Sequence, residues 1–439
     1  MKPSRYNHFF PYSDTQSIAY NALSNSLALI GKENLEAYND FCEYGKELSS
    51  ELIKDLKKGK FLVEDYVDEL QTIRFNMLRF RYNSSSLVLT ITPTTDCNFR
   101  CLYCLEKSVL SSKYMSEEVQ DKLIKMLESY KKVISSFTVV WYGGEPLMAF
   151  DVVKKLSKKF IEICDENSIT YNASMVTNGY LLSRDILKQL PELKISSVQI
   201  TIDGLPDVHN RMRPHVDGGE TFDVIMNNLI NGYDLLPHVA LRINVDKSNT
   251  TVGKEIYKIL EKNDLTEKIK PYYGRLVNDT GSYEQSLCLS SADFSELAHE
   301  FSLEITESKN NIPIHYPQHR WVYCCADALN AHCIDAEGLM YRCWADIGDK
   351  DKCVGSLMET IISTDNRYFQ YMLHDPTIDS KCKDCAVLPL CMGGCPLKRI
   401  IGDDDVCSNY KYVLDKCLHS STRTFQLARE ANDTKEKIE

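Results

Sequence analysis

Three closely spaced cysteines follow the first clear strand pattern of the chain. Cys97, Cys101 and Cys104 form a C-x3-C-x2-C segment directly after an apolar run at residues 87–92. Three thiolates at this spacing can wrap one iron–sulfur cluster. A four-iron cluster normally takes four cysteines, so one iron would stay open to a small molecule. A structural zinc site usually takes four protein ligands, and no fourth Cys or His lies nearby in the sequence. We therefore expect these three cysteines to bind a catalytic cluster.

A second group of cysteines lies in the C-terminal third, where 11 of the 17 fall between residues 324 and 417. A disulfide scaffold accounts for many cysteines in a short secreted chain. This chain has 439 residues and an odd cysteine count, and its first residues lack the apolar core of a signal peptide. The clustering therefore predicts metal or redox chemistry in a reducing, cytoplasmic setting. A pair of zinc knuckles is the alternative for this second group.

Regular strand and helix patterns surround the first cysteine segment. Strands are predicted at residues 87–92, 137–141, 169–176, 197–202, 239–245 and 269–276. Helical periodicity separates most of them, as at residues 116–133, where Ser116 is the expected N-cap, and at residues 151–164. Repeated strand–helix units imply a parallel sheet with helices outside, with the chemistry at the C-terminal strand ends.

The rest of the chain predicts further domains. Within residues 1–85 we expect strands at 18–23, 27–30 and 61–63 and helices near 46–58 and 65–80. The expected domains are residues 1–85, 86–310 and 311–420, with a polar tail at 421–439. The predicted fold class is α/β: a partial (β/α)6 TIM-like barrel with a small N-terminal α+β domain and a C-terminal Cys-rich iron–sulfur domain.

Charge and composition exclude some functions. The net charge of -11 disfavours general nucleic-acid binding and a polybasic membrane anchor. The sequence contains no run of ~18 apolar residues that could span a membrane. Away from the two cysteine groups, Cys42, Cys164 and Cys288 are expected to be buried apolar filler.

The first cysteine segment resembles the signature of radical S-adenosylmethionine (SAM) enzymes, C-x3-C-x-aromatic-C, with Tyr103 as the aromatic residue. Residues 143–146 resemble that family's GGEP motif, residues 177–179 its TNG turn, and residues 209–213 its H-x3-R segment. The resemblance implies that the Glu145 carboxylate contacts the SAM amino group and that Arg213 suits the SAM carboxylate. It implies SAM binding by Tyr103, Gly143, Gly144, Glu145, Pro146, Ser174, Thr177, Asn178, Asp203 and Arg213. A surface salt bridge is the alternative for Arg213, and a turn cap is the alternative for Asp203.

The second cysteine group resembles the SPASM domain, which holds two auxiliary 4Fe–4S clusters in a subset of radical SAM enzymes. The matching spacings are G-x4-C at residues 338–343, C-x2-C-x5-C-x3-C at residues 382–395, and a later cysteine. The resemblance implies a first auxiliary cluster on Cys324, Cys343 and Cys395, and a second on Cys382, Cys385, Cys391 and Cys407.

Several cysteines depart from the SPASM pattern. Cys325 stands beside Cys324, and Cys333 and Cys353 are additional. Cys325 or one of the additional cysteines is the candidate fourth ligand of the first auxiliary cluster, unless that position is open to substrate. Cys417 is an alternative to Cys407.

The resemblance implies SAM and three 4Fe–4S clusters as cofactors, and an electron donor such as flavodoxin or ferredoxin. Reductive cleavage of SAM would give a 5′-deoxyadenosyl radical that removes a hydrogen atom from the substrate. Relatives with a SPASM domain mostly modify peptides, and residues 1–85 resemble a leader-recognition domain, although a plain structural cap is an alternative. We therefore favour a maturase of a ribosomally made precursor peptide that forms a thioether or carbon–carbon crosslink. The alternatives are an anaerobic sulfatase maturase, which forms formylglycine, and an iron–sulfur electron-transfer protein.

Overall fold

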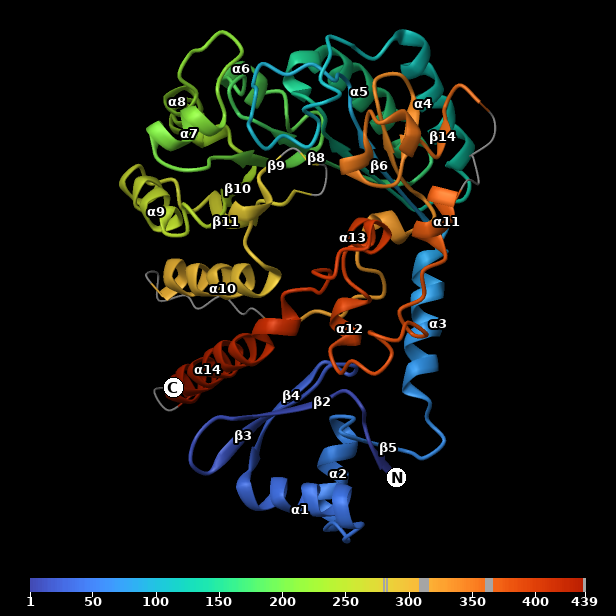
Figure 1. The fold of residues 1–439 in the computed structure, drawn as a ribbon, viewed down its shortest axis with the longest axis vertical. Helices are drawn as coiled ribbons and strands as arrows, with labels where there is room; N and C mark the ends of the chain where they lie inside the picture. The colour runs from blue at the N-terminus through green and yellow to red at the C-terminus, as the bar shows by residue number, and fades with distance from the viewer. Residues whose placement is uncertain (279–280, 282, 308–315, 360–365, 437–439) are drawn as a thin grey trace. The chain divides into compact units, whose positions relative to one another are not determined.

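The computed structural model describes residues 1–278, 281, 283–307, 316–359 and 366–436, with side chains for all of these except residues 307 and 428–436. The chain forms two compact units (Figure 1). Unit 1 comprises Met1–Arg81, Ser291–Tyr323 and His374–Glu439, and unit 2 comprises Tyr82–Ser290 and Cys324–Leu373. Each unit therefore combines segments that are distant in sequence.

Unit 2 is built on a nine-stranded sheet with the order β11-β10-β9-β8-β7-β6-β12-β13-β14. Neighbouring strands from β11 to β6, and on to β12, are parallel. The first six in chain order are β6 (Ser86–Ile91), β7 (Ser136–Trp141), β8 (Thr170–Thr177), β9 (Ile195–Thr201), β10 (His238–Val245) and β11 (Ile269–Arg275). The antiparallel strands β13 (Leu339–Tyr341) and β14 (Gly355–Ser356) follow β12 (Ala331–Ile334) at the edge. The six predicted strands and the α/β class are confirmed.

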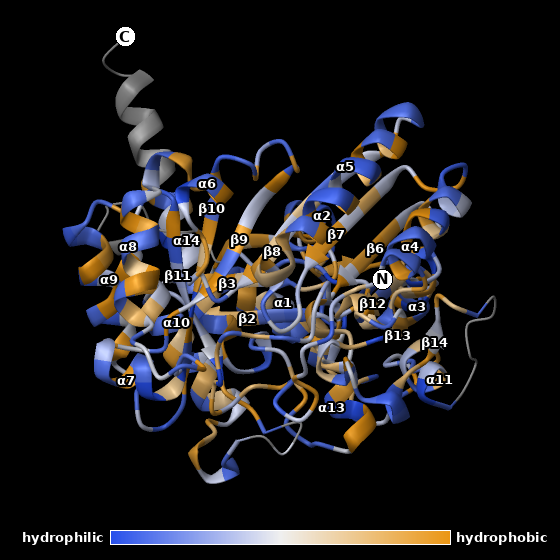
Figure 2. Ribbon diagram, turned by 90° about the horizontal axis from the view of Figure 1, so that it is seen from above, coloured by the Kyte–Doolittle hydropathy of each residue, from blue (hydrophilic) through white to orange (hydrophobic). Residues whose placement is uncertain are grey.

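Helices between the parallel strands bury apolar faces. Ser116 caps α4 (Glu117–Tyr130), because its side chain accepts a hydrogen bond from the backbone N–H of Val119. α5 (Phe150–Glu166) buries Val153, Leu156 and Phe160 at helical spacing and has both hydrophobic and hydrophilic residues along its length (Figure 2). The other helices of unit 2 are α6 (Arg184–Leu187), α7 (Pro206–Met212), α8 (Phe222–Asn231), α9 (Val252–Lys262) and α11 (Asn366–Met372), with short 3-10 turns η1 (Pro146–Ala149), η2 (Tyr233–Leu235), η3 (Gln285–Leu287), η4 (Cys325–Asp327), η5 (Trp344–Asp346) and η6 (Lys350–Lys352).

Unit 1 contains an antiparallel sheet of β2 (Asn7–Pro11), β3 (Gln16–Asn21) and β4 (Ser26–Gly31), and a short pair of β1 (Lys2–Pro3) with β5 (Leu62–Val63). The hairpin of β3 and β4 was predicted, whereas β2 was not. Ser49 caps α2 (Ser50–Lys58), so this helix begins later than predicted. The other helices of unit 1 are α1 (Lys32–Tyr44), α3 (Glu69–Arg81), α10 (Ser291–Glu307), α12 (Leu388–Cys391), α13 (Pro396–Ile401) and α14 (Tyr410–Glu436).

One hydrophobic core joins the beginning of the chain to its C-terminal region within unit 1. Tyr20 and Ile73 from the N-terminal segment pack in one buried cluster with Leu388, Leu414 and Leu418. Residues 421–436, expected as a polar tail, continue α14, and residues 437–439 lie outside the described part of the chain. The expected domain limits at residues 85, 310 and 420 stay predictions.

The isolated cysteines divide into two groups. Cys164 and Cys288 are buried, as expected of apolar filler, whereas Cys42 is exposed. The prediction for Cys42 is therefore wrong, because α1 buries Tyr38 but leaves Cys42 exposed to solvent.

Candidate active site

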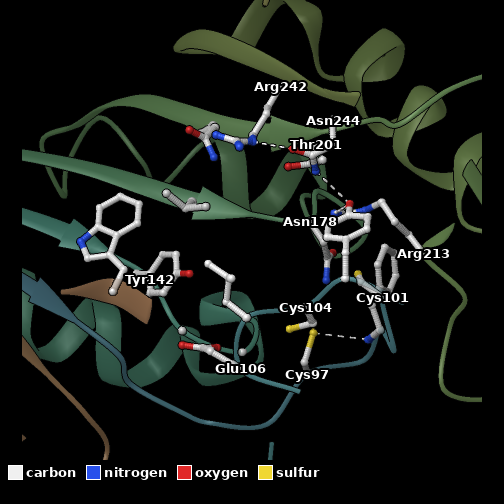
Figure 3. Close-up of a pocket in the computed structure, with 18 of the residues that line it drawn as sticks. Cys97, Cys101, Cys104, Glu106, Tyr142, Asn178, Thr201, Arg213, Arg242 and Asn244 are labelled. Atoms are coloured by element: carbon white, nitrogen blue, oxygen red, sulfur yellow. Dashed lines mark hydrogen bonds between the residues drawn. The ribbon is translucent and has the colours of Figure 1, made fainter. Parts of the chain in front are cut away.

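A pocket of about 250 Å³ lies where the parallel strands of unit 2 end (Figure 3). Nine of the predicted site residues line it: Cys97, Cys101, Tyr103, Cys104, Gly143, Gly144, Thr177, Asn178 and Arg213. Four others, Glu145, Pro146, Ser174 and Asp203, are not among the lining residues. The segments after several different strands therefore meet around one cavity, as expected of a parallel α/β fold.

The loop that carries the three cysteines is tied down at its start. The hydroxyls of Thr94 and Thr95 donate to the carbonyls of Lys113 and Ser111, at 2.7 and 2.9 Å. The backbone N–H of Phe99 donates to Cys97 Sγ at 3.4 Å. The thiols are thus held on one wall of the pocket (Figure 3).

The electrostatics of these thiols suit a metal group. Burial raises the pKa of the Cys104 thiol to about 12 and also raises the pKa values of Cys97 and Cys101. Arg213 opposes this shift at Cys101 and Cys104. Buried thiols ionise readily only where a positive charge replaces the proton, and an iron–sulfur cluster supplies that charge. The three-thiol donor set therefore fits a cluster with one open iron.

The glycine pair after β7 lets two backbone segments touch. A Cβ on Gly144 would stand 2.1 Å from the carbonyl oxygen of Asp96, and one on Gly143 would stand 2.8 Å from that of Thr94. Gly143 also has a φ of +113°, which side chains disfavour. These glycines therefore bring the turn after β7 against the backbone that leads into Cys97.

Glu145 connects the turns that follow β7 and β8. Its side chain is fully buried and accepts hydrogen bonds from the Thr177 hydroxyl at 2.7 Å, the Asn178 N–H at 2.8 Å and the Leu147 N–H at 3.0 Å. Burial raises the pKa of this carboxyl, and the bonds from Asn178, Thr177 and Leu147 oppose that shift. Pro146 begins the 3-10 turn η1 directly after Glu145. The expected contact of Glu145 with the SAM amino group stays a prediction.

Tyr103 is the centre of a buried polar network. Its hydroxyl donates to the Asp203 carboxylate and accepts from Arg213 Nη1 at 2.7 Å and Asn244 Nδ2 at 2.9 Å. The Arg213 guanidinium also lies over the ring of Phe99, 5.7 Å from its centroid. Arg213 is only 7% exposed, which contradicts the alternative of a surface salt bridge.

His209 supports this network from α7. Its Nδ1 accepts a hydrogen bond from the backbone N–H of Asp203 at 3.2 Å. Burial, with a smaller effect of Arg213, lowers the pKa of His209 to about 3. The neutral imidazole therefore fixes the turn after β9 through its bond to Asp203. In the H-x3-R segment, His209 thus holds this turn while Arg213, four residues later, lines the pocket.

Several lining residues escaped the sequence prediction, including Glu106, Thr201, Arg242, Asn244, Arg275 and Trp344. Two of them could have been found, because Arg242 and Asn244 alternate with apolar residues in β10 and so share one face. Trp344 had no such signal. Its Nε1 donates to Thr90 Oγ1 at 2.9 Å across more than 250 residues of sequence.

In unit 1, two of the predicted auxiliary ligands, Cys382 and Cys407, have raised thiol pKa values, and Cys385 and Cys391 contribute to both shifts. Burial, Asp379 and then Cys391 and Cys385 raise the pKa of Cys382 to about 12, and Cys391 and Cys385 also act on Cys407 after burial. Cys395 N donates to the carbonyl of Val406, next to Cys407. Cys417 lies instead with its Sγ 3.7 Å from Nδ1 of His299.

The predicted ligands of the first auxiliary cluster divide between the units. Cys324, Cys325 and Cys343 belong to unit 2, where the Cys324 and Cys325 sulfurs lie 3.9 Å apart, whereas Cys395 belongs to unit 1. This ligand set stays a prediction.

Among the residues that the structure describes, no group of three or more His, Cys, Asp or Glu side chains is placed to bind one metal ion. That finding concerns a single ion, whereas a four-iron cluster is larger. No helix in the described residues is long and apolar enough to cross a membrane.

Residues 91–245 match the radical SAM superfamily model. The chain therefore contains a radical SAM domain, and its sheet has the radical SAM fold. This superfamily uses a 4Fe–4S cluster together with SAM.

Two curated proteins illustrate the range of similar chains. The cysteine-type anaerobic sulfatase-maturating enzyme of Clostridium novyi (strain NT) is 23% identical over 372 residues, which cover 77% of this chain and 96% of that protein. The radical SAM cyclopropyl synthase TigE of Paramaledivibacter caminithermalis is 18% identical over 431 residues, which cover 89% of this chain and 87% of that protein.

Solved structures share the fold. Native anSMEcpe with bound AdoMet and Cp18Cys peptide has a TM-score of 0.59 at 18% identity and covers 77% of this chain and 99% of its own. Streptococcus suis SuiB bound to precursor peptide SuiA has a TM-score of 0.54 at 16% identity and covers 93% of this chain and 97% of its own.

Proposed function

We propose that this chain is a radical SAM enzyme that modifies a ribosomally made precursor peptide and forms a thioether or carbon–carbon crosslink. The observation that carries this proposal is the extent of the shared fold. The likeness to precursor-bound SuiB spans 93% of this chain, against 77% for anSMEcpe.

In the proposed reaction Cys97, Cys101 and Cys104 would hold the catalytic cluster to which SAM binds. With both groups bound, the cofactor supplies an agent that removes a hydrogen atom from an unactivated carbon. Arg213 offers its Nε, which is buried and has no hydrogen-bond partner, to a carboxylate such as that of SAM. Phe99 and other apolar side chains of the pocket exclude water from the reacting atoms.

The N-terminal sheet supports recognition of a leader peptide. Among the described residues β4 pairs only with β3, so its other edge offers unpaired backbone groups to an extended peptide. Addition of a strand at such an edge is a common mode of peptide binding. We propose that residues 1–85 bind the leader in this way and that Cys382, Cys385, Cys391 and Cys407 hold an auxiliary cluster.

An anaerobic sulfatase maturase is the second candidate. The sequence comparison includes cysteine-type anaerobic sulfatase-maturating enzymes, which are 23–26% identical to this chain. An iron–sulfur electron-transfer protein is disfavoured, because that function does not account for the radical SAM domain at residues 91–245.

The deciding experiment uses the full chain, reconstituted anaerobically with iron and sulfide and then given SAM and a reductant. About twelve irons per chain are expected for three 4Fe–4S clusters, together with formation of 5′-deoxyadenosine. One arm receives a precursor peptide encoded beside the gene, and the other receives a sulfatase peptide with its target Cys. Loss of two hydrogens from the precursor with no change in the sulfatase peptide supports the crosslinking maturase. Formylglycine in the sulfatase peptide alone would establish the second candidate.

The role of the leader has its own test. A precursor without its leader should be modified at least about tenfold more slowly than the intact peptide at subsaturating concentration, which corresponds to ~1.4 kcal/mol of lost binding. A leader added in trans should inhibit the intact peptide. Equal rates for both peptides would remove the leader-binding role.

A further inference from the structure

Cys333, which the SPASM pattern does not use, lies in the middle of the unit 2 cysteines. It stands on β12, where it is paired in register with Thr90 of β6 and with Tyr341 of β13. Paired residues of neighbouring strands point to the same face of a sheet, and so do residues two positions apart. Cys343 follows Tyr341 by two positions, so the chain returns toward the Cys333 face at the end of the hairpin.

A buried arginine brings the other cysteines to this place. Arg342 is 1% exposed, and its Nε and Nη2 donate to the carbonyl of Ala326 at 3.2 and 2.9 Å. These bonds tie the turn that carries Cys324 and Cys325 to the residue before Cys343. The same guanidinium places a fixed positive charge beside a group of sulfurs.

The packing brings the cysteine segments together. Trp344, the residue after Cys343, packs against the buried cluster that contains Cys333. On the turn that Arg342 holds, the Cys324 and Cys325 sulfurs lie 3.9 Å apart. Cysteine thiolates are the usual ligands of iron–sulfur clusters, so segments that gather them in one place suit such a group.

Plain packing explains only part of this arrangement. Cys333 is 1% exposed and belongs to a buried cluster with Tyr341 and Ile347, as an apolar filler would. Apolar packing alone does not account for the position of Cys333 near the segments that carry other cysteines and near the buried Arg342 guanidinium. Cys353 contacts the same cluster, but its thiol donates to the carbonyl of Gly355 at 2.9 Å, and it provides a matched control.

We propose that Cys333 is a ligand of an auxiliary iron–sulfur cluster in unit 2, together with Cys324 and Cys343. The inference rests on the auxiliary clusters of the proposed function. It assigns one of their ligands to a cysteine outside the SPASM spacing.

The test starts from a full-length variant in which Cys97, Cys101 and Cys104 are all replaced by Ala, which removes the ligands of the catalytic cluster. After anaerobic reconstitution this background should hold about eight irons per chain, as two four-iron clusters require. Adding Cys333→Ala should lower the count to about four, or change the EPR spectrum of the reduced protein and the Mössbauer spectrum. Adding Cys353→Ala should leave iron, sulfide and spectra as in the background.

A serine variant guards against loss of the fold. Cys333→Ser keeps the size of the side chain and offers an oxygen ligand, so it should retain iron and shift the EPR spectrum. Unchanged iron and unchanged spectra in both Cys333 variants would overturn the proposal. A background protein that holds zinc or no iron would overturn the auxiliary clusters and this inference together. Failure of both peptide substrates, with the Cys333 effects present, would refute the proposed function alone.

Discussion

At the residue scale, the pocket depends on buried polar side chains whose partners come from distant parts of unit 2. Tyr103 lies in the cysteine loop, while its partners Asp203, Arg213 and Asn244 follow or belong to later strands. A buried group that loses its partner pays the full cost of desolvation. Single substitutions in this network should therefore have large effects.

Tyr103→Phe removes the hydroxyl that three buried groups share. We expect the free energy of unfolding of the metal-free protein to fall by about 1–3 kcal/mol, because Asp203 and its neighbours lose a hydrogen-bond partner. Urea unfolding monitored by circular dichroism measures the change. Tyr272→Phe is the control, since the Tyr272 hydroxyl bonds Gln199 at an exposed position, and it should stay within about 0.5 kcal/mol. Equal losses in both variants would contradict the network.

His209 should make unit 2 sensitive to acid. Its pKa is lowered to about 3 in the folded protein by burial and Arg213, while an unfolded histidine titrates near 6.5. A depressed folded pKa gives stability that is present above the unfolded pKa and is lost as the pH falls toward the folded pKa. Between pH 7.5 and 5.0 the metal-free protein should therefore lose about 2 kcal/mol through this residue.

The variant His209→Asn isolates this contribution, because an amide oxygen can accept the Asp203 N–H without titrating. Its loss of stability between the two pH values should be smaller than that of the original protein by the same amount. His238→Asn, at an exposed position of β10, should retain the original loss. The prediction fails if His209→Asn and His238→Asn show the same pH dependence.

At the element scale, the turns after the strands build the pocket by touching one another. The turn after β7 packs against the cysteine loop through Gly144, and Glu145 bonds the turn after β8. The shape of the cysteine loop therefore depends on a strand that follows it in the chain.

Gly144→Ala should displace the cysteine loop, because the new Cβ would meet the Asp96 carbonyl at 2.1 Å. We expect reconstituted iron to fall by about four per chain, which is the catalytic cluster, and SAM cleavage to be lost. Gly219→Ala is the control, since nothing lies within 4 Å of its Cβ position. A normal iron count in Gly144→Ala would show that the loop tolerates the shift.

Much of this scale could be predicted from the sequence, because a strand and its following turn are local. The apolar runs and the residues directly behind them led to Cys97, Gly144 and Thr177, all of which line the pocket. Trp344 and β12 could not be predicted in this way, since their positions follow from pairing with β6 over a long sequence separation. The hydrogen bonds of the Glu145 carboxylate with Thr177 and Asn178 could not be predicted either, because they form between turns that are more than 30 residues apart in the sequence.

At the scale of the whole molecule, unit 1 is assembled from three separate segments. Its core combines β3 and α3 with side chains of α12 and α14. The sequence predicted the first 85 residues as a domain from local patterns alone. It had no local signal for the apolar partners that residues 374–418 provide.

Leu418→Ala should test this shared core. Leu418 is fully buried in the cluster, so the variant should lose about 2–5 kcal/mol of stability in unit 1. Hydrogen exchange should then speed up in β3 and α3, far away in sequence, while β7 and β8 of unit 2 keep their protection. Leu427→Ala, at a 48% exposed position of the same helix, should change neither the stability of unit 1 nor the exchange rates in β3 and α3. Faster exchange confined to α14 would mean that the segments unfold separately.

The shared core of unit 1 also sets an order of events during synthesis. About 300 residues separate α3 from the α12 and α14 side chains that cover it. At ~5–20 residues per second, the ribosome takes on the order of 15–60 s to make that stretch. During this time the apolar side chains of β3 and α3 lack the partners that cover them in the folded protein. The strands of the unit 2 sheet are synthesised in the same interval. We therefore expect that a chaperone that binds nascent apolar chains would raise the yield of folded protein, because it would cover this segment until α12 and α14 are made.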